Sequence, residues 1–200
     1  MPLFRTLSPQ RRIFTNIPTL ETERLTLRRM LPKDALDMYE YARRPDVTEY
    51  LTWYEHDSPE YTKSYLKALQ RAYARGEFFD WALILRSENK MIGTCGFTAL
   101  WESDLKGEIG YVLSPDYRGL GLMTEAAKRV IAFGFDELGL ARIEARHVFG
   151  NERSAAVMRR CGMEYEGTLR KSMMIKGELK TVSVYAILKE DRARLTERKQ

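Results

Sequence analysis

A glycine-containing turn between a strand and a helix is the part of this sequence best suited to chemistry. Residues 107–113 alternate as a strand, residues 114–116 turn the chain, and Arg118, Gly119 and Gly121 lead into a helix. Glycines let consecutive backbone N–H groups point at an anion, and the following helix N-terminus adds free donors and partial positive charge. Arg118 adds a full charge and a two-pronged donor. The segment therefore predicts a phosphate-binding site.

Two common phosphate motifs do not fit this turn. No Gly-Lys-Ser/Thr follows the glycines, as a Walker loop requires, and no Gly-x-Gly-x-x-Gly is present, as a dinucleotide-binding turn requires. On these grounds alone, a purely structural turn remains the alternative to a phosphate site.

The spacing around the turn resembles the acetyl-CoA signature of the GCN5-related N-acetyltransferases (GNAT). That signature reads Gln or Arg, two residues, Gly, one residue, then Gly or Ala. Arg118 and Gly121 match it, and Met123 stands at its last position. The following Thr-Glu-Ala of residues 124–126 resembles the branch of the family that acetylates ribosomal-protein N-termini.

Further matches in the expected order extend the resemblance over about residues 19–188. Leu-Glu-Thr-Glu-Arg-Leu-Thr-Leu-Arg at 20–28 resembles the opening strand of the same branch, and other matches follow at 138–144, 151–155 and 161–167. The resemblance implies an acetyl-CoA-dependent N-acetyltransferase that transfers acetyl directly to a primary amine.

The resemblance also implies how the cofactor acetyl-CoA is held. In the family, the strand before the glycine turn separates from its neighbour, and pantetheine occupies the gap like an added strand. Val112 and Leu113 would then offer backbone hydrogen bonds, and Asn151, which also fits a helix N-cap, would contact pantetheine. The backbone expected to hold the pyrophosphate is that of Arg118, Gly119, Leu120, Gly121, Leu122, Met123 and Thr124.

Two residues are candidates for proton transfer, since the attacking amine must be neutral and the leaving thiolate needs a proton. Glu108 falls where the histone-acetyltransferase branch keeps its general base, and apolar neighbours should raise its pKa. A solvent-facing strand glutamate is the alternative. The resemblance places Ser154 near the sulfur as a proton donor. Tyr111 and Tyr117 could also donate, although core packing or turn capping explains them better.

The cysteines and histidines indicate neither covalent nor metal chemistry. Cys95 and Cys161 stand in apolar settings without an activating neighbour, which favours direct transfer over a ping-pong route. His56 and His147 are the only histidines, and neither has the partner spacing of a metal site or a triad. We therefore expect no metal.

The elements that must position these residues follow from hydrophobic spacing and capping residues. Strands are expected at 22–30, 78–86, 91–100, 107–113, 142–148, 164–174 and 179–188, and helices at 32–42, 58–76, 120–138 and 154–160. A helix between the strands at 107–113 and 142–148 implies parallel pairing there. We expect one α/β (mixed α+β) GNAT-like domain, with a mixed, mostly antiparallel sheet of about seven strands flanked by helices.

The expected helix at 58–76 has the clearest local signals. Ser58 can cap it, Pro59 suits its first position, and Gly76 can end it. Its expected apolar face contains Tyr61, Tyr65, Leu69 and Ala72 or Tyr73.

Length, composition and charge fit a soluble, cytoplasmic enzyme. The chain has 200 residues, 44% of them hydrophobic, without an apolar run of about 18 residues or a signal peptide. Of the net charge of +5, residues 1–30 carry +4, residues 189–200 carry +2, and the remainder carries −1. Solvated termini therefore explain the charge better than nucleic acid binding does. The expected division is an N-terminal extension at 1–17, the acetyltransferase domain at 18–189 and a charged tail at 190–200.

The acceptor is less defined than the donor. Residues 43–80 and the strands at 164–188 should build the acceptor side, and residues 53–57 and 78–80 mix aromatic and acidic groups that suit a cationic amine. The chain reads Lys180-Thr181-Val182 where relatives often carry an aspartate, which weakens transfer of a detailed acceptor preference. The candidate acceptors are a protein N-terminus, such as that of a ribosomal protein, or a small amine. A non-catalytic acyl-CoA-binding module is the alternative from another class, and a homodimer stays open.

Overall fold

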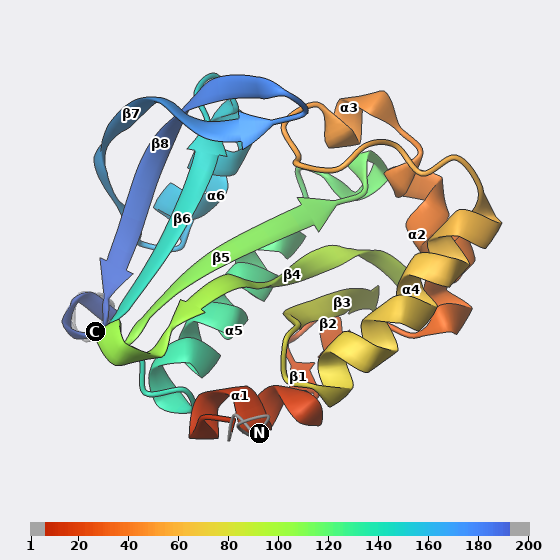
Figure 1. Cartoon of the computed structure of the whole chain (residues 1–200), viewed down its shortest axis with the longest axis horizontal. Coiled ribbons are helices and arrows are strands. Elements are labelled where there is room, and N and C mark those ends of the chain that lie inside the picture. Colours follow the sequence, from red (N-terminus) through yellow and green to blue (C-terminus); the bar gives the residue numbers. More distant parts are fainter. Residues whose placement is uncertain (1–6, 193–200) are drawn as a thin grey trace, which may run out of the picture.

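A mixed sheet of eight strands forms the centre of the computed structural model, which describes residues 7–192 (Figure 1). The strand order is β1-β2-β3-β4-β5-β6-β8-β7, and only β5 and β6 pair in parallel. The strands are β1 (Leu20–Glu21), β2 (Leu25–Arg28), β3 (Phe79–Leu85), β4 (Lys90–Trp101), β5 (Lys106–Leu113), β6 (Arg142–Val148), β7 (Glu164–Ile175) and β8 (Glu178–Leu188). The expected mixed α/β fold is confirmed, and the two-residue β1 accounts for the strand beyond the expected seven.

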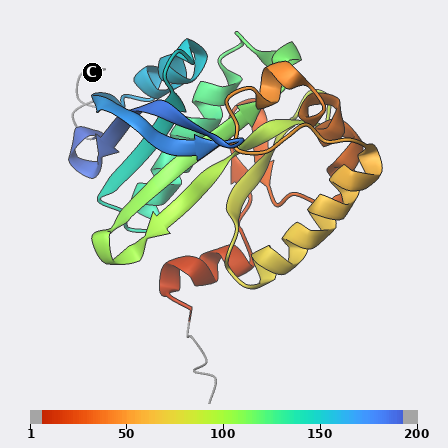
Figure 2. The same ribbon diagram turned by 45° about the horizontal axis from the view of Figure 1, so that its top comes forward.

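Helices cover both faces of the sheet. α5 and α6 lie on one face, whereas α2 and α4 lie on the other, over β3 and β4 (Figures 1 and 2). The helices are α1 (Pro9–Thr15), α2 (Ala35–Ala42), α3 (Pro45–Thr48), α4 (Pro59–Ala74), α5 (Leu122–Asp136) and α6 (Glu152–Arg160). Short 3-10 turns lie between β2 and α2 (η1, Pro32–Asp34), between β4 and β5 (η2, Glu102–Asp104) and between β5 and α5 (η3, Pro115–Tyr117). Sequence periodicity did not predict α1 and α3, because each is too short to show a helical repeat.

Helix α4 begins where its capping residues predict and buries part of the expected face, Leu69 and Tyr73. The Ser58 hydroxyl accepts a hydrogen bond from the Tyr61 amide at 3.0 Å. The helix buries Thr62, Leu66, Leu69 and Tyr73. Tyr61 is 52% exposed, so its assignment to the apolar face was wrong. The buried stripe is rotated toward Thr62 and Leu66, which leaves Tyr61 beside the cavity described below.

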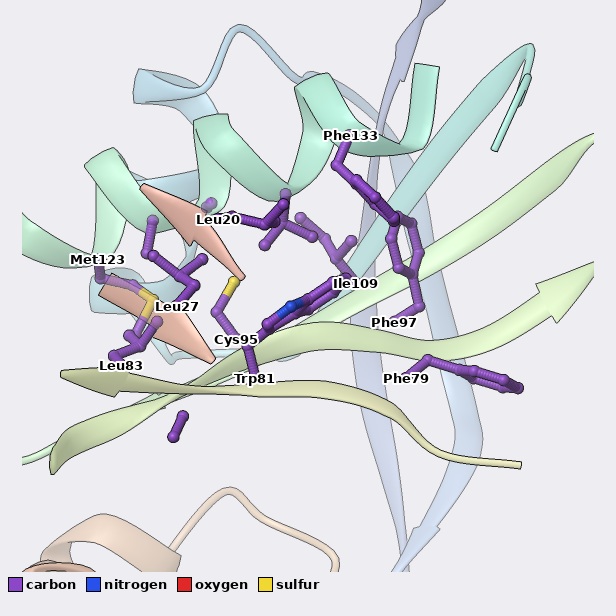
Figure 3. Close-up of a cluster of buried hydrophobic side chains, with 14 of the residues drawn as sticks. Leu20, Leu27, Phe79, Trp81, Leu83, Cys95, Phe97, Ile109, Met123 and Phe133 are labelled. Carbon is purple, nitrogen blue, oxygen red and sulfur yellow. The ribbon is translucent and has the colours of Figure 1, made fainter. Parts of the chain in front are cut away.

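Aromatic side chains fill the core between the sheet and α5. Trp81 and Phe97 point from the sheet toward Phe133 of α5 (Figure 3). Phe14 of α1 is fully buried and packs edge-to-face against Phe79, with ring centroids 4.8 Å apart. The expected domain boundaries stay predictions, although Phe14 adds part of residues 1–17 to the core. Residues 1–6 and 193–200 lie outside the described part of the chain.

Strands β5 and β6 pair only at their beginnings. Residues 106–109 of β5 pair with residues 142–145 of β6, after which the two strands diverge (Figure 1). A register shift in β4 between Phe97 and Ala99 leaves Thr98 as an extra residue beside this point. Such a bulge redirects a strand and its side chains. Between residues 7 and 192, no helix is long and apolar enough to cross a membrane.

Candidate functional site

The divergence of β5 from β6 opens the sheet at its centre. Residues 110–113 of β5 pair with β4 on one side and have no strand partner in the described chain on the other. Residues 146–148 of β6 pair only with β8. A cavity of about 670 Å³ lies here, and Val112 is among its lining residues. An extended ligand segment could therefore pair with the free edge of β5 as an added strand would.

The glycine turn that follows β5 presents free backbone donors. Gly119 has a φ of 82° and Gly121 a φ of 77°, a backbone conformation that favours glycine. Gly121 is the N-cap of α5 and offers no capping side chain. Across the described residues, no hydrogen bond uses the backbone N–H groups of residues 119–124. This turn therefore has the donors and the helix dipole of an anion site.

Arg24, which the sequence did not indicate, fixes the glycine turn from the start of β2. Its guanidinium donates to the Leu120 carbonyl at 2.9 Å and pairs with Glu125 at 2.7 Å. Glu125 also accepts hydrogen bonds from the Thr22 hydroxyl at 2.6 Å and from the Arg24 amide at 2.9 Å. These bonds draw the pKa of Glu125 below its usual value, although partial burial opposes them. We call these contacts of Arg24 with Leu120 and Glu125 the Arg24 clamp. About a hundred residues separate the partners in sequence, so no local motif could reveal it.

Arg118 lies among other charged groups at the same end of β5. Its guanidinium is 3.4 Å from the Asp46 carboxylate, which also pairs with Arg44 at 3.0 Å. Burial lowers the pKa of Arg118, and the positive charge of Arg153 acts in the same direction. Arg44 and Arg118 thus share the carboxylate of Asp46, and Arg44 also pairs with Asp116. The charge of Arg153 adds to this group, and the local excess of positive charge suits a phosphate.

Leu122 and Met123, both predicted to contact the cofactor, contribute backbone rather than side chain to the turn. Their side chains are 2% and 5% exposed. Met123 points into the core near Leu27 and Leu83 (Figure 3). A bulky residue at the last position of the signature therefore leaves the outer face of the turn unobstructed.

Glu108 points into the cavity from the position where β5 and β6 begin to part. Its side chain is 12% exposed, and its Oε2 lies 3.1 Å from Arg146 Nε. The Thr98 hydroxyl donates to Oε1 at 3.3 Å. Burial raises the pKa of Glu108, while the charge of Arg146 and the hydrogen bond from Thr98 oppose this effect. The carboxylate can therefore accept a proton from a group in the cavity.

Arg146 is a second residue that sequence reasoning missed. It occupies the β6 face that carries Glu144, and its Nη2 is 3.6 Å from that carboxylate. Its Nε lies close to the Glu108 carboxylate, but the geometry of this pair does not make a hydrogen bond. Nε has no other hydrogen-bond partner among the described residues. Arg146 therefore holds Glu108 mainly through charge, and it lines the same cavity.

On the opposite face of β5, Tyr111 and Ser154 form a pair across the gap. The Tyr111 hydroxyl lies 3.0 Å from the Ser154 hydroxyl and donates to the Ser154 carbonyl at 3.0 Å. Burial raises the pKa of Tyr111, and the bond to Ser154 partly offsets that rise. Asn151 caps α6 by accepting a hydrogen bond from the Ser154 amide at 3.2 Å. Asn151 and Ser154 both line the cavity, whereas the Tyr117 hydroxyl instead meets Glu88 at 2.5 Å.

The structure brings the predicted residues into two neighbouring groups. Glu108, Val112, Asn151 and Ser154 line the cavity. Leu113 ends the same strand, and residues 118–124 form the turn beyond it, outside the cavity lining.

Neither cysteine is placed as a nucleophile. Cys95 is buried in the core (Figure 3), and burial raises its thiol pKa well above the ordinary value. Burial raises the pKa of Cys161 to about 12. Neither residue lines the cavity. Within residues 7–192, no group of three or more His, Cys, Asp or Glu side chains could hold a metal ion.

The acceptor side of the cavity carries both aromatic and acidic side chains. Of the residues expected on this side, the cavity is lined by Trp53, Tyr54, Glu55, His56, Asp57 and Asp80. Phe78 does not line it. Strand β7 closes it with two apolar residues, Met173 and Ile175. Phe79 instead packs in the core on the other face of the sheet, because neighbouring strand residues point in opposite directions.

Known proteins share both the sequence and the fold. The family description of the acetyltransferase (GNAT) domain matches residues 24–164. An uncharacterized N-acetyltransferase called p20 from Bacillus licheniformis is 32% identical over 175 residues, which cover 88% of this chain and 98% of that protein.

Two solved structures are similar over nearly their whole length. A GNAT-family acetyltransferase from Bacillus anthracis has a TM-score of 0.76 and 29% identity, covering 86% of this chain and 99% of that one. The ribosomal-protein-S5-alanine acetyltransferase from Vibrio fischeri has a TM-score of 0.74 and 26% identity, covering 87% of this chain and 98% of that one.

Proposed function

Because this chain belongs to the GNAT acetyltransferase family, we propose that it transfers the acetyl group of acetyl-CoA directly to the N-terminal α-amine of a protein. The observation that carries the proposal is the unpaired edge of β5, which leads from Glu108 in the cavity to free amides at the glycine turn. A donor that is extended at one end and phosphorylated at the other matches both features.

The residues present fit acetyl-CoA. The free edge of β5 at Val112 and Leu113 suits the amide groups of pantetheine. The N–H groups of residues 119–124 suit the pyrophosphate, with Arg118 adding charge. Asn151 lies beside the gap, where its side-chain amide can also meet pantetheine. Acetyl-CoA supplies the acetyl group as a thioester.

Proton transfer is assigned to groups on the two sides of β5. Glu108 accepts the proton that the amine loses on attack, because it lines the acceptor cavity and its pKa is raised toward neutrality. Ser154, held by Tyr111 at 3.0 Å, lies on the other side of the gap and donates the proton that the departing thiolate requires. The buried cysteines support direct transfer without an acetyl-enzyme.

The protein N-terminus is proposed as acceptor from the similarity to the Vibrio fischeri enzyme, which acts on ribosomal protein S5 by its description. The second candidate is a small amine, which the internal Asp80 favours, since that acid suits a cationic molecule that enters the cavity.

An acceptor screen separates these candidates. CoA release should be measured with peptides that begin with Ala, Ser or Met, and with polyamines and aminoglycosides as the small-amine arm. We expect the highest kcat/KM with a peptide, and N-terminally blocked copies of the same peptides should be inert. Turnover confined to small amines would contradict the protein acceptor, and an acetyl-enzyme trapped without amine would contradict direct transfer.

Loss of the Arg24 clamp should weaken donor binding without changing the chemical step. Replacing Arg24 with Met removes the donor to Leu120 and the partner of Glu125. We expect KM for acetyl-CoA to rise about five- to tenfold, since an order of magnitude corresponds to roughly 1.4 kcal/mol, the scale of one charged hydrogen bond. Saturating kcat should stay within about twofold of the wild type.

Steady-state kinetics with acetyl-CoA varied at saturating acceptor measures the effect. Arg86→Met is a matched control, because Arg86 is an exposed arginine that donates to the Thr22 carbonyl without contacting the turn. An unchanged KM in Arg24→Met, or an equal rise in both variants, would show that the clamp does not shape the donor site.

A further inference from the structure

A trough runs across the sheet from β5 to β3 on the acceptor side. Asp80 on β3 faces Gly96 on β4, and Gly96 faces Gly110 on β5. A Cβ on Gly96 would lie 2.7 Å from Asp80 Oδ1, and one on Gly110 would lie 2.6 Å from Thr98 Cγ2. Both contacts are closer than real Cβ atoms make. Because neither glycine carries a side chain, the surface of the sheet between Gly110 and Asp80 stays open.

Two polar side chains line the β3 end of the trough, an acid without a counter-ion and a hydroxyl without a hydrogen bond. Asp80 Oδ1 accepts a hydrogen bond from the Trp81 amide at 3.0 Å. Burial raises the pKa of Asp80 to about 7, opposed by hydrogen bonds from Thr94 and the Trp81 amide but by no cation. The Tyr41 hydroxyl is buried and has no hydrogen-bond partner in the described chain. Asp80 and Tyr41 both line the cavity.

Burial of these two groups without full pairing costs free energy of folding. The buried Tyr41 hydroxyl has no hydrogen bond to replace its lost hydration. The partly buried Asp80 has two hydrogen bonds but no counter-ion, so its lost hydration is compensated only in part. Burial raises the pKa of the Tyr41 hydroxyl, and the charge of Asp80 adds to this rise. One ligand group that donates hydrogen bonds and carries positive charge would satisfy both.

The wall above this end of the trough is suited to a cation. The His56 ring lies between three aromatic rings, with centroid distances of 5.4 Å to Trp53, 5.0 Å to Tyr61 and 5.7 Å to Tyr65. All four line the cavity. Aromatic faces attract ammonium groups, and burial lowers the pKa of His56, which favours its uncharged form.

We propose that this end of the trough is a subsite for a second cationic group of the acceptor, held by Asp80 and the Tyr41 hydroxyl. The proposal rests on the proposed acetyl transfer for the reacting amine, but not on whether that amine belongs to a protein. Adjacent strands lie about 4.8 Å apart, so two strand spacings place Asp80 about 10 Å from Gly110. The acceptor therefore carries two amines or an amine and a guanidinium, separated by several bonds.

Pairs of acceptors that differ by one charge test the subsite. One arm uses 1,4-diaminobutane and 1,6-diaminohexane, each against the monoamine of the same chain length. The other arm uses short alanine peptides with Lys at the first, second or third position, each against norleucine at that position. We expect the wild type to prefer the charged member of at least one pair. In Asp80→Asn that preference in kcat/KM should fall about ten- to one-hundredfold, the scale of a charge-assisted hydrogen bond.

Tyr41→Phe distinguishes a ligand contact from a structural role. Because the hydroxyl has no protein partner, its removal should not destabilise the fold. We expect KM for the preferred charged acceptor to rise about threefold or more, with KM for its neutral counterpart unchanged. Tyr39→Phe, on the same helix as Tyr41 but outside the cavity lining, should preserve the wild-type preference.

Binding of the diamines to the CoA-loaded protein, measured by calorimetry, provides a readout that does not need turnover. The subsite would be overturned if Asp80→Asn lowered kcat/KM equally for the charged and the neutral acceptor, or if it left the preference for the charged acceptor unchanged. It would also be overturned if the wild type bound no diamine. Failure of the proposed function looks different: peptides would stay unacetylated, while the diamine arm would still show the charge preference.

Discussion

Replacing Glu108 with Gln should lower kcat/KM for the acceptor about 10²- to 10⁴-fold near neutral pH, the range attributed to general acid–base catalysis. Glutamine keeps the size of the side chain and can still accept the hydrogen bond from Thr98, but it cannot take a proton. KM for acetyl-CoA should remain close to that of the wild type, because Glu108 lies in the acceptor cavity and not at the glycine turn.

The pH dependence of this variant separates catalysis from structure. The pKa of Glu108 is raised, chiefly by burial, so the ionised base is lost as the pH falls through a value above the ordinary glutamate pKa. Among the charged groups that face it, Arg146 and Lys106 act against this rise and Glu144 adds to it. Wild-type kcat/KM should therefore show an acidic limb that Glu108→Gln lacks. The change in rate that comes from ionisation of the acceptor amine itself should remain in the pH profiles of both proteins.

Glu144→Gln is the matched control. Glu144 belongs to the same charged row and pairs with Arg142 at 2.9 Å, but it does not line the cavity. It should lose far less activity and retain the acidic limb. Wild-type kinetics in Glu108→Gln, or equal losses in the two variants, would remove Glu108 as the base.

The sequence was most informative where function and local structure use the same residues. The glycines that allow positive φ at 119 and 121 also expose backbone donors, so one short segment predicted both the turn and its free N–H groups. The parallel pairing of β5 with β6 followed from the helix between them. Glu108 was found because strand alternation and a family resemblance pointed to the same position.

What the sequence did not reveal depends on contacts between distant segments. Arg24 meets Leu120 only because β2 and α5 pack together. Arg146 approaches Glu108 because two parallel strands bring them to one face before they diverge. Tyr41 and Asp80 line one cavity because α2 packs on β4, the strand that pairs with β3. Tyr61 of α4 was wrongly assigned to the buried face because tyrosine can line a cavity as readily as a core.

Replacing Asp80 with Asn should stabilise the free protein at alkaline pH. The ordinary aspartate pKa of 3.8 is raised to about 7 in the folded chain, mainly by burial. The folded state therefore binds this proton more tightly than the unfolded state does, and stability falls as the pH rises from about 4 to about 7. Since one pKa unit corresponds to about 1.4 kcal/mol, the ionised acid should cost about 2–4 kcal/mol above this interval.

Urea unfolding at about pH 4 and about pH 8 measures this effect. Asn keeps an oxygen for the Trp81 amide and carries no charge that burial would penalise. The gain should therefore appear at the higher pH and be nearly absent at the lower one. Asp104→Asn, at an exposed acid in η2, should not reproduce it. A variant that is equally or less stable at both values would show that Asp80 is already compensated in the free protein.

We expect Asp80→Asn to raise the stability of the free protein but to weaken its preference for charged acceptors. Opposite effects of this kind are expected of an acid whose role is to bind a ligand. An acid that only supported the fold should destabilise the protein when neutralised and should affect charged and neutral acceptors alike. An acid kept in the cavity for a ligand should do the reverse, because its desolvation is offset only when a cation binds. Measuring both in one variant tests whether the chain retains Asp80 for its acceptor at the expense of its own stability.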